Sequence, residues 1–492
     1  MAKNKAKRPN QEPQNSKSSK KTKTSAIVTP PPDAPASSKT LHDLMLTEDD
    51  IEISVDTLNT LAANPSVLKS KACRDLRTAV FGFRKACTIG FNSADDSNLT
   101  AKISGALADE GYVEARISLA EMRIRDQVPK LGALCRWVRD LDVVSGLAEQ
   151  VHVKDAKRSA KEEQVLKVLD AIARVIGPVD RTVDPDTALD GPIIPRKAWN
   201  LRGTKNRADT YASVLDRSIF RKSSIALQFN ITSCFRTIER TPGPERKPPN
   251  HHPAIVHASN DKTIPFSSEP PNTTHHKHPN VPNLHVLKDA LTADECTRII
   301  AATETIGFTP DAPIRAEGEE TSILAHNVYW LADNTFCAGL WSRVAPFIPP
   351  AVDGKAVRGL NRRFRVYRYV PHAEYRIHID GAWPPSSEDP VANKYIYDAS
   401  PPGAKQSSLF TFLIYLNDEF EGGETTFFLP SVKEGSLNAY PVKPIQGSIA
   451  MFPHGEVEGA LLHEGTGVRE GEKPSAKYVI RTDVLYDIDR TL

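Results

Sequence analysis

Two hydrophobic periods divide the sequence. From residue 41 to about 180, apolar residues recur at three- and four-residue steps, which is the period of an amphipathic helix. After about residue 284 the chain changes to short β-branched and aromatic runs separated by turn residues, from RRFRVYRYV to KYVIRTDVLY. We therefore expect an N-terminal α-helical domain over 41–180, of unknown role, and a mainly β domain over 284–492.

Helix starts are marked by capping residues. Ser159 with Glu162, and Thr292 with Glu295, have the spacing of a capping box, in which each side chain binds the other residue's backbone N–H. Thr47 is followed by three acidic residues, which favour a helix N-terminus. The sequence thus predicts helices that begin at these three positions.

The β pattern of the C-terminal part predicts its architecture. A helix near residue 292 precedes many short strands, and Gly422-Gly423 separates two of them as a hairpin turn would. This order is typical of a double-stranded β-helix, or jelly roll, with flanking helices.

Residues 181–283 lose periodicity, and ten prolines fall between residues 242 and 283. We expect an irregular, proline-rich connector. The HHKH run within it (His275, His276 and His278) has no acidic or cysteine ligand at metal-binding spacing, so a metal site there is disfavoured.

Charge is concentrated in the first 40 residues, which hold nine Lys/Arg and two acidic residues in a chain of net charge +2. The remainder is therefore mildly acidic. We expect residues 1–40 to be a disordered basic tail, with clusters that resemble nuclear-localisation signals or make weak nucleic-acid contacts. Nucleic acid is not otherwise an expected partner.

The cellular compartment is predicted from features that the sequence lacks. The six cysteines are scattered without a C-x-x-C pair, no apolar segment follows the N-terminal charges, and no run approaches 18 apolar residues. We expect a cytoplasmic or nuclear protein that is not secreted and does not span a membrane.

Candidate chemistry lies in YRIHIDGAW, residues 375–383. His378 and Asp380 are two residues apart in a stretch that reads as a strand, so their side chains share one face. Only His454 and His463 follow as candidate third ligands. Two histidines and a carboxylate with open positions form the facial triad of non-haem Fe(II) oxygenases. Zinc is the competing metal, but its usual helical H-E-x-x-H is absent.

A cation on the final strand would complete such a site. Lys477 and Arg481 share one face of KYVIRTDVLY, and a buried cation there would pair with the distal carboxylate of a dicarboxylate co-substrate. A solvent-reaching edge lysine is the alternative interpretation of Lys477.

Residues from about 284 to 487 resemble the 2-oxoglutarate- and Fe(II)-dependent dioxygenases, specifically the prolyl 4-hydroxylase-like branch. The resemblance is carried, in order, by RFRVYRYVPHAEYRIHIDG, FTFLIYLNDEFEGGETTFF, GSIAMFPHGEVEGALLHEG and KYVIRTDVLY. The helical region before residue 240 resembles no family whose function could be transferred.

The resemblance implies iron ligation by His378, Asp380 and His463, with His463 favoured over His454 because it stands in an L-H-E-G strand start. It implies that Lys477 or Arg481 anchors 2-oxoglutarate and that Tyr369 is a further contact. It also implies O₂ as co-substrate and a dependence on ascorbate.

Two insertions depart from the family pattern. The basic residue usually follows the distal histidine by about ten positions, and Lys477 follows it by fourteen. A loop at EKPS (472–475) restores the match if it bulges outward; otherwise Arg481 is the better anchor. A second insertion, 384–406, is either a lid over the substrate groove or a disordered surface loop.

These features predict an oxidoreductase: a 2-oxoglutarate- and Fe(II)-dependent dioxygenase that hydroxylates a protein side chain, with a peptide substrate and a protein partner for the helical domain. Alternatives are a small-molecule hydroxylase of the same superfamily, an adaptor with a vestigial barrel, and, from the basic tail alone, a nucleic-acid oxygenase.

Overall fold

A computed structural model describes residues 46–89, 98–143, 146–147, 158–182, 191–203, 209–222, 231–245, 252–310, 323–371, 373–455 and 459–489. The predicted basic tail, residues 1–40, lies outside these ranges. The chain divides into two compact units, one up to Phe83 and one from Arg84 onward.

The first unit is helical and has little core. It contains α1 (Glu48–Ala62), α2 (Pro65–Leu68), the 3-10 turn η2 (Lys71–Cys73) and the start of α3 (Arg74–Ile89). Thr47 caps α1 in a capping box with Asp50, as its position predicted. No residue of α1 is buried.

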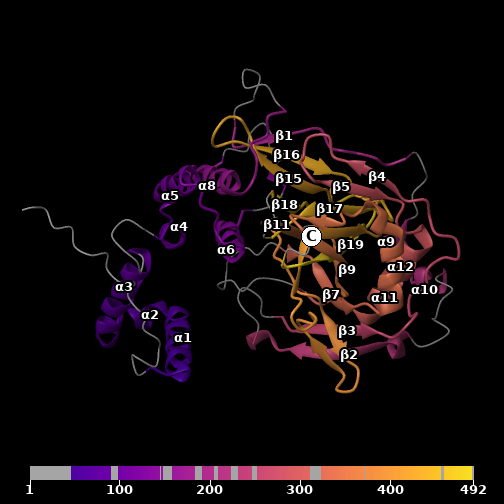
Figure 1. The fold of residues 1–492 in the computed structure, drawn as a ribbon, viewed down its shortest axis with the longest axis horizontal. Helices are drawn as coiled ribbons and strands as arrows, with labels where there is room; N and C mark the ends of the chain where they lie inside the picture. Colours follow the sequence, from indigo (N-terminus) through magenta and orange to yellow (C-terminus); the bar gives the residue numbers. More distant parts are fainter. Residues whose placement is uncertain are drawn as a thin grey trace, which may run out of the picture. The chain divides into compact units, whose positions relative to one another are not determined.

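In the second unit, four helices form a cluster beside the β-sheets (Figure 1): α4 (Leu99–Ala108), α5 (Tyr112–Ile124), α6 (Leu131–Leu141) and α8 (Ala160–Ile176). The capping box of Ser159 and Glu162 is present at the start of α8. The helices bury Trp137 and Leu169 in one hydrophobic core together with Ile377 and Phe428 from the strands. The helices that we assigned to a separate domain over 41–180 thus share a core with the sheet.

Two large sheets make up most of the second unit. The first has six strands, in the order β1 (Ile193–Pro195), β16 (Leu437–Val442), β15 (Thr425–Pro430), β18 (Leu462–Gly465), β11 (Ala373–His378) and β6 (Ile323–Leu324). Side chains such as Phe427 of β15 meet Phe452 of the second sheet in a shared core.

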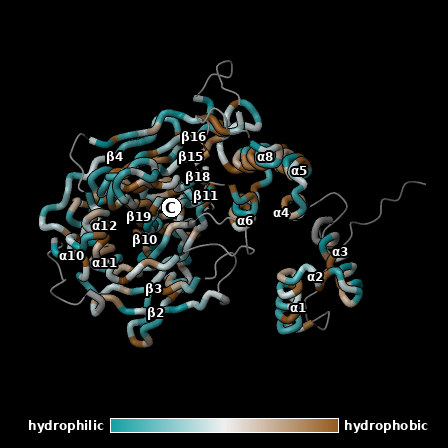
Figure 2. The backbone as a smooth tube through the Cα atoms, turned by 180° about the vertical axis from the view of Figure 1, so that it is seen from behind, coloured by the Kyte–Doolittle hydropathy of each residue, from teal (hydrophilic) through white to brown (hydrophobic). Residues whose placement is uncertain are grey.

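The second sheet has eleven strands. Nine follow the order β2 (Phe235–Thr241), β3 (Ala254–Ser259), β7 (His326–Leu331), β10 (Arg363–Tyr369), β19 (Lys477–Asp487), β14 (Gln406–Tyr415), β17 (Ile449–Pro453), β5 (His285–Lys288) and β4 (Thr274–Lys277). In addition, β9 (Lys355–Leu360) pairs with β19, and β8 (Ala351–Val352) pairs with β9. The strands at the centre of this region are among the most hydrophobic stretches of the chain (Figure 2). The expected mainly β C-terminal region is confirmed.

Helices cover the outer side of the eleven-stranded sheet (Figure 1): α9 (Thr210–Leu215), α10 (Ser218–Lys222), α11 (Ala293–Ile306) and α12 (Asn334–Val344). Thr292 and Glu295 form the predicted capping box at the start of α11, and Cys296, Ile299 and Ile300 are buried there. Buried Glu295 also pairs with Arg343 of α12, at 2.8 Å, which ties the two helices together.

Part of the predicted connector is regular structure. Residues 181–283 contribute β1 to the six-stranded sheet, β2, β3 and β4 to the larger sheet, and helices α9 and α10. Proline-rich composition favours extended backbone, and extended backbone also pairs at sheet edges, which composition does not reveal.

The insertion at 384–406 is ordered. Its strands β12 (Ser387–Asp389) and β13 (Lys394–Ile396) form a two-stranded hairpin, and Glu388 pairs with Arg236 at 3.0 Å. The alternative of a disordered loop is therefore wrong for this segment, whereas its role as a lid stays a prediction. No described helix combines the length and hydrophobicity that crossing a membrane requires.

Candidate metal centre

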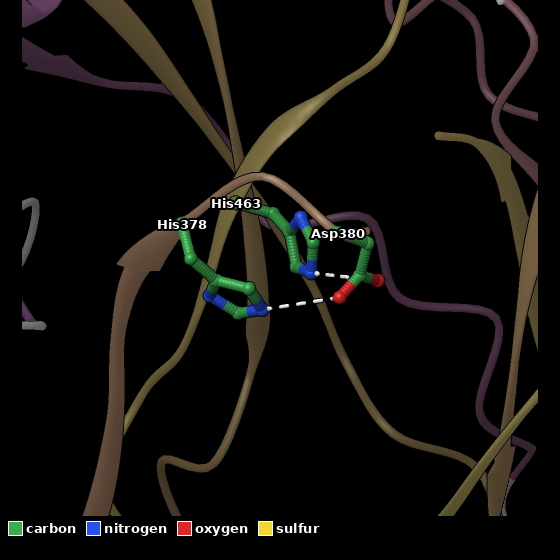
Figure 3. A group of neighbouring side chains, drawn as sticks. All are labelled: His378, Asp380 and His463. Atoms are coloured by element: carbon green, nitrogen blue, oxygen red, sulfur yellow. Dashed lines mark ion pairs between the residues drawn. The ribbon is translucent and has the colours of Figure 1, made fainter. Parts of the chain in front are cut away.

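His378, Asp380 and His463 converge at one end of the six-stranded sheet (Figure 3). His378 on β11 stands directly opposite His463 on β18, and Asp380 follows the end of β11. The Nε2 atoms of His378 and His463 lie 3.5 and 3.6 Å from the Asp380 carboxylate. All three donor atoms lie within 4.8 Å of one another, and no other such group of three metal-binding side chains occurs among the described residues.

Both imidazoles present the same nitrogen to this cluster. Nδ1 of His378 lies 2.7 Å from the carbonyl of Arg376, and Nδ1 of His463 lies 3.1 Å from the carbonyl of Leu461. A carbonyl only accepts, so each Nδ1 carries the proton and each Nε2 keeps a lone pair. Burial lowers the pKa of His463 to about 3, which keeps its ring neutral. Both rings are therefore prepared as metal ligands.

The carboxylate of Asp380 is held ionised. Burial alone would raise its pKa, but Arg481 and the neighbouring histidines hold the pKa well below its ordinary value. Arg481 Nη1 lies 3.2 Å from Oδ1, and the hydroxyl of Thr411 donates to Oδ2 at 2.6 Å. Arg481 also pairs with Asp483 at 3.2 Å. Arg481 is thus already paired with two carboxylates of the protein.

His454 lies next to this cluster without joining it. Its Nε2 contacts the hydroxyl of Ser408 at 2.8 Å and its Nδ1 contacts that of Thr411 at 2.7 Å. Because Thr411 donates to Asp380, it accepts from His454, so His454 supports the carboxylate through Thr411. Both of its nitrogens are occupied, and the structure brings His463 to the cluster instead.

Lys477 is a buried cation, with only 2% of its surface exposed. Desolvation lowers its pKa to about 8, with Glu424 acting in the opposite direction. Glu424 itself pairs with Lys443, and no carboxylate forms an ion pair with Lys477 within the described part of the chain. Its ammonium lies 4.9 Å from the ring of Tyr369. A buried cation without an acidic partner is suited to bind an anion.

Residues 364–482 match the family model described as the 2OG-Fe(II) oxygenase superfamily. This region belongs to that superfamily. The match spans all three clustered donors and both candidate anchors of the co-substrate. No curated protein matches the chain.

Solved structures resemble the oxygenase region at low identity. A viral collagen prolyl hydroxylase of Paramecium bursaria Chlorella virus-1 is 19% identical, with a TM-score of 0.27; the match covers 42% of this chain and 97% of that one. An oxidoreductase of the 2OG-Fe(II) oxygenase family from Burkholderia pseudomallei is 15% identical, with a TM-score of 0.26, over 42% and 85%. HygX of Streptomyces hygroscopicus, solved with nickel and 2-oxoglutarate, is 13% identical, with a TM-score of 0.25, over 42% and 83%.

The structure bears on two sequence-based questions about the oxygenase region. The four residues 471–474, which include most of the EKPS insertion, are exposed and loop outward before β19 begins at Lys477. Tyr369 stands directly opposite Lys477 across β10 and β19, and both line the cavity that holds His378. This geometry favours Lys477 over Arg481 as the anion-binding residue.

The histidines of the run at 275–278 make local contacts. His275 contacts His285 at 2.8 Å and His276 contacts Thr274 at 3.0 Å. His278 accepts from two backbone N–H groups, those of Asn280 and Val281. These rings serve the local structure of β4 and β5.

Sequence reasoning missed the support around Asp380. Thr411 lies on β14, and Cys135 on α6 contacts the carbonyl of Ile379 at 3.4 Å. Arg376, two residues before His378, pairs with Asp142 at the end of α6. The contacts of Thr411, Cys135 and Arg376 join residues that are distant in the sequence, and no local pattern in the sequence signals them.

Proposed function

We propose that the protein is a 2-oxoglutarate- and Fe(II)-dependent dioxygenase of the prolyl 4-hydroxylase-like type, which hydroxylates a protein side chain. The observation that carries the proposal is the convergence of His378, Asp380 and His463 beside the unpaired ammonium of Lys477. We infer that the two sheets form the double-stranded β-helix of this class, with the site between them.

The donor set fits Fe(II). Two imidazoles and one ionised carboxylate suit a divalent metal, and three protein ligands leave positions for a chelating co-substrate and O₂. Zinc is bound by the same donor types in some catalytic sites. The family match to residues 364–482 favours iron.

The fit to 2-oxoglutarate rests on Lys477. A dicarboxylate that bridges this ammonium and the metal cluster would give Lys477 the acidic partner that the protein does not supply. Tyr369 lies against the ammonium, and burial raises the pKa of its phenol, so the hydroxyl stays protonated. Arg481 is occupied by Asp380 and Asp483, which leaves it a supporting role.

When bound, iron and 2-oxoglutarate supply the oxidising chemistry that uses O₂ to hydroxylate a C–H bond. The chain's own residues orient and neutralise the reactants. Asp380 offsets metal charge while Arg481 and Thr411 fix its two oxygens. The carbonyls of Arg376 and Leu461 fix the imidazole tautomers. The burial of Asp380, His463 and Lys477 excludes bulk water from the centre.

A protein substrate is the proposed target, and proline is the residue type proposed for hydroxylation. Ascorbate is proposed to sustain repeated turnover, as the resemblance implies, and the protein partner of the helical region stays a prediction. So do a cytoplasmic or nuclear location and any nucleic-acid contact by the basic tail.

Hydroxylation is tested by incubating the iron-loaded protein with 2-oxoglutarate and a library of proline-containing peptides. We expect succinate release to rise in proportion to a mass increase of one oxygen atom in a peptide. His378→Ala should abolish both signals, and Arg221→Gln, an exposed position on α10, should change neither. Succinate release that no peptide or protein extract stimulates would contradict a protein substrate.

A further inference from the structure

One face of β10 leads outward from the metal centre. Arg363, Arg365 and Tyr367 alternate along the strand, so their side chains lie on the same face. Tyr367 lines the cavity that holds His378. Arg363 lies four residues away from Tyr367, or about 13 Å along an extended strand. Arg363 therefore marks the outer end of a face that begins at the site.

Aromatic rings hold Arg363 in place. Its guanidinium carbon lies 4.1 Å from the ring centre of Trp383 and 5.0 Å from that of Tyr329. Trp383 follows the metal-cluster residue Asp380 by three positions. Contact with two rings orders the guanidinium before any ligand binds, which reduces the entropy lost on binding.

The donors at this outer end lack acceptors. Within the described part of the chain, the Arg363 guanidinium has no hydrogen bond and no ion pair. The nearby carboxylate of Glu388 is taken by Arg236 at 3.0 Å and Arg362 at 3.6 Å. The indole N–H of Trp383 is buried without a hydrogen-bond partner. A buried donor without an acceptor, such as this indole N–H, is rare and costly.

The ordered hairpin β12–β13 lies beside Arg363 and Trp383. Tyr395 of β13 packs against the hydrophobic cluster that includes Tyr329, and its hydroxyl contacts Ser386 at 2.7 Å. Tyr397 meets the ring of Trp383 edge-on at 5.9 Å. The insertion thus places aromatic rings next to Trp383, which Arg363 covers.

We infer that Arg363, with Trp383, binds an anionic group on the substrate, a carboxylate or a phosphate. This inference rests on the proposed function and names its substrate class: a protein segment with an acidic group about four residues from the hydroxylated residue, since an extended peptide advances about 3.3 Å per residue. The planar guanidinium matches the paired oxygens of either anion.

The inference is tested by binding of labelled peptides to the full-length protein loaded anaerobically with Fe(II) and 2-oxoglutarate. Each peptide carries one proline and a single Glu, phosphoserine or Gln at a position two to six residues away on either side. We expect Glu or phosphoserine to bind at least about tenfold more tightly than Gln at one position, with a preference that weakens as salt rises. The stronger of the two identifies the source of the anion.

Variants assign the preference to Arg363. Arg363→Gln should reduce it to less than about twofold, and Arg363→Glu should favour a Lys peptide over the Gln peptide. Arg221→Gln, which removes a positive charge from α10, should leave it intact. A merely structural role of Arg363 would alter thermal stability without changing the ratio between Glu and Gln peptides.

The inference would be overturned if the Glu, phosphoserine and Gln peptides bound with equal affinity at every position. It would also be overturned if none of these peptides bound. A preference that survives Arg363→Gln would overturn it as well. The visible absorption band of the Fe(II)–2-oxoglutarate complex is recorded in the same samples. Its absence in the wild-type protein means that the proposed function has failed, whereas its presence without an anion preference rejects only the role of Arg363.

Discussion

Lys477 and Arg481 stand four residues apart on one strand and have different surroundings. Arg481 is paired with Asp380 and Asp483, while Lys477 is buried without an ion pair in the described structure. The sequence predicted that both side chains lie on the same face of the strand. It did not predict which of the two forms ion pairs with the protein's own carboxylates. That distinction depends on Asp380 and Asp483, which the fold brings to Arg481.

Replacing Lys477 separates stability from function. Its pKa falls to about 8 in the folded protein, so protonated Lys477 opposes folding at neutral pH, and the penalty fades as pH rises from about 8 toward its ordinary value. Lys477→Met should raise the free energy of unfolding at pH 7 by up to about 3 kcal/mol. Urea unfolding without co-substrate measures this change.

The same Lys477→Met variant should lose 2-oxoglutarate affinity by at least about tenfold, since it removes the proposed cationic partner of the distal carboxylate. Isothermal titration under anaerobic conditions measures it. A variant that is destabilised but binds 2-oxoglutarate normally would show that Lys477 has only a structural role.

Binding of 2-oxoglutarate should depend on pH through the same group. Lys477 is protonated below about pH 8, so affinity should be constant below that value and fall above it, by up to about tenfold per pH unit. Above pH 8, binding should take up a proton, which titrations in buffers of different ionisation enthalpy detect. Lys477→Arg stays charged, so its affinity should stay flat up to pH 10.

Thr411 should tune the metal site through Asp380. Thr411→Val keeps the side-chain shape but removes the hydroxyl that donates to Oδ2, and Fe(II) affinity should fall about tenfold. Thr411→Ser should retain the affinity. Competition with a chelator of known affinity measures both, and equal affinities for Val and Ser would show that the hydrogen bond does not matter.

At the scale of elements, the helix starts were predicted correctly from local sequence. The capping residues at Thr47, Ser159 and Thr292 all cap helices, because a capping box depends only on neighbours in the sequence. The strands within 181–283 were missed, since β1 and β3 pair with β16 and β7, which lie far along the chain. Proline content suggested extended backbone but not its partner.

A prediction at the scale of elements concerns the turn before β17. Gly447 has φ of +76°, its carbonyl accepts from Ala290 and Leu291, and an added Cβ would collide with the Leu291 backbone. Gly447→Ala should cost at least about 2 kcal/mol of unfolding free energy. Gly132→Ala, inside α6 with open space around it, should stabilise by about 0.5–1 kcal/mol. Similar midpoints in urea for both variants would contradict this account.

At the scale of the whole molecule, helices α4, α5, α6 and α8 share a core with the six-stranded sheet. Periodicity placed a boundary near residue 180 because it registers a change of element type, whereas a shared core is visible only in three dimensions. The two compact units instead divide at Phe83 and Arg84.

This shared core predicts coupled unfolding. Trp137→Ala on α6 should destabilise the protein by about 3–5 kcal/mol, and metal binding and far-UV dichroism should be lost in one transition. Separate transitions for helices and metal site would show that the core is not shared in solution.

The central claim is that His463, rather than His454, completes a ferrous site with His378 and Asp380. The most direct measurement is the anaerobic titration of Fe(II) and 2-oxoglutarate, followed by the visible charge-transfer band, in wild type, His463→Ala and His454→Ala. We predict the band in wild type and in His454→Ala, and its loss in His463→Ala. A band that persists without His463, or that never forms in the wild-type protein, would contradict the account.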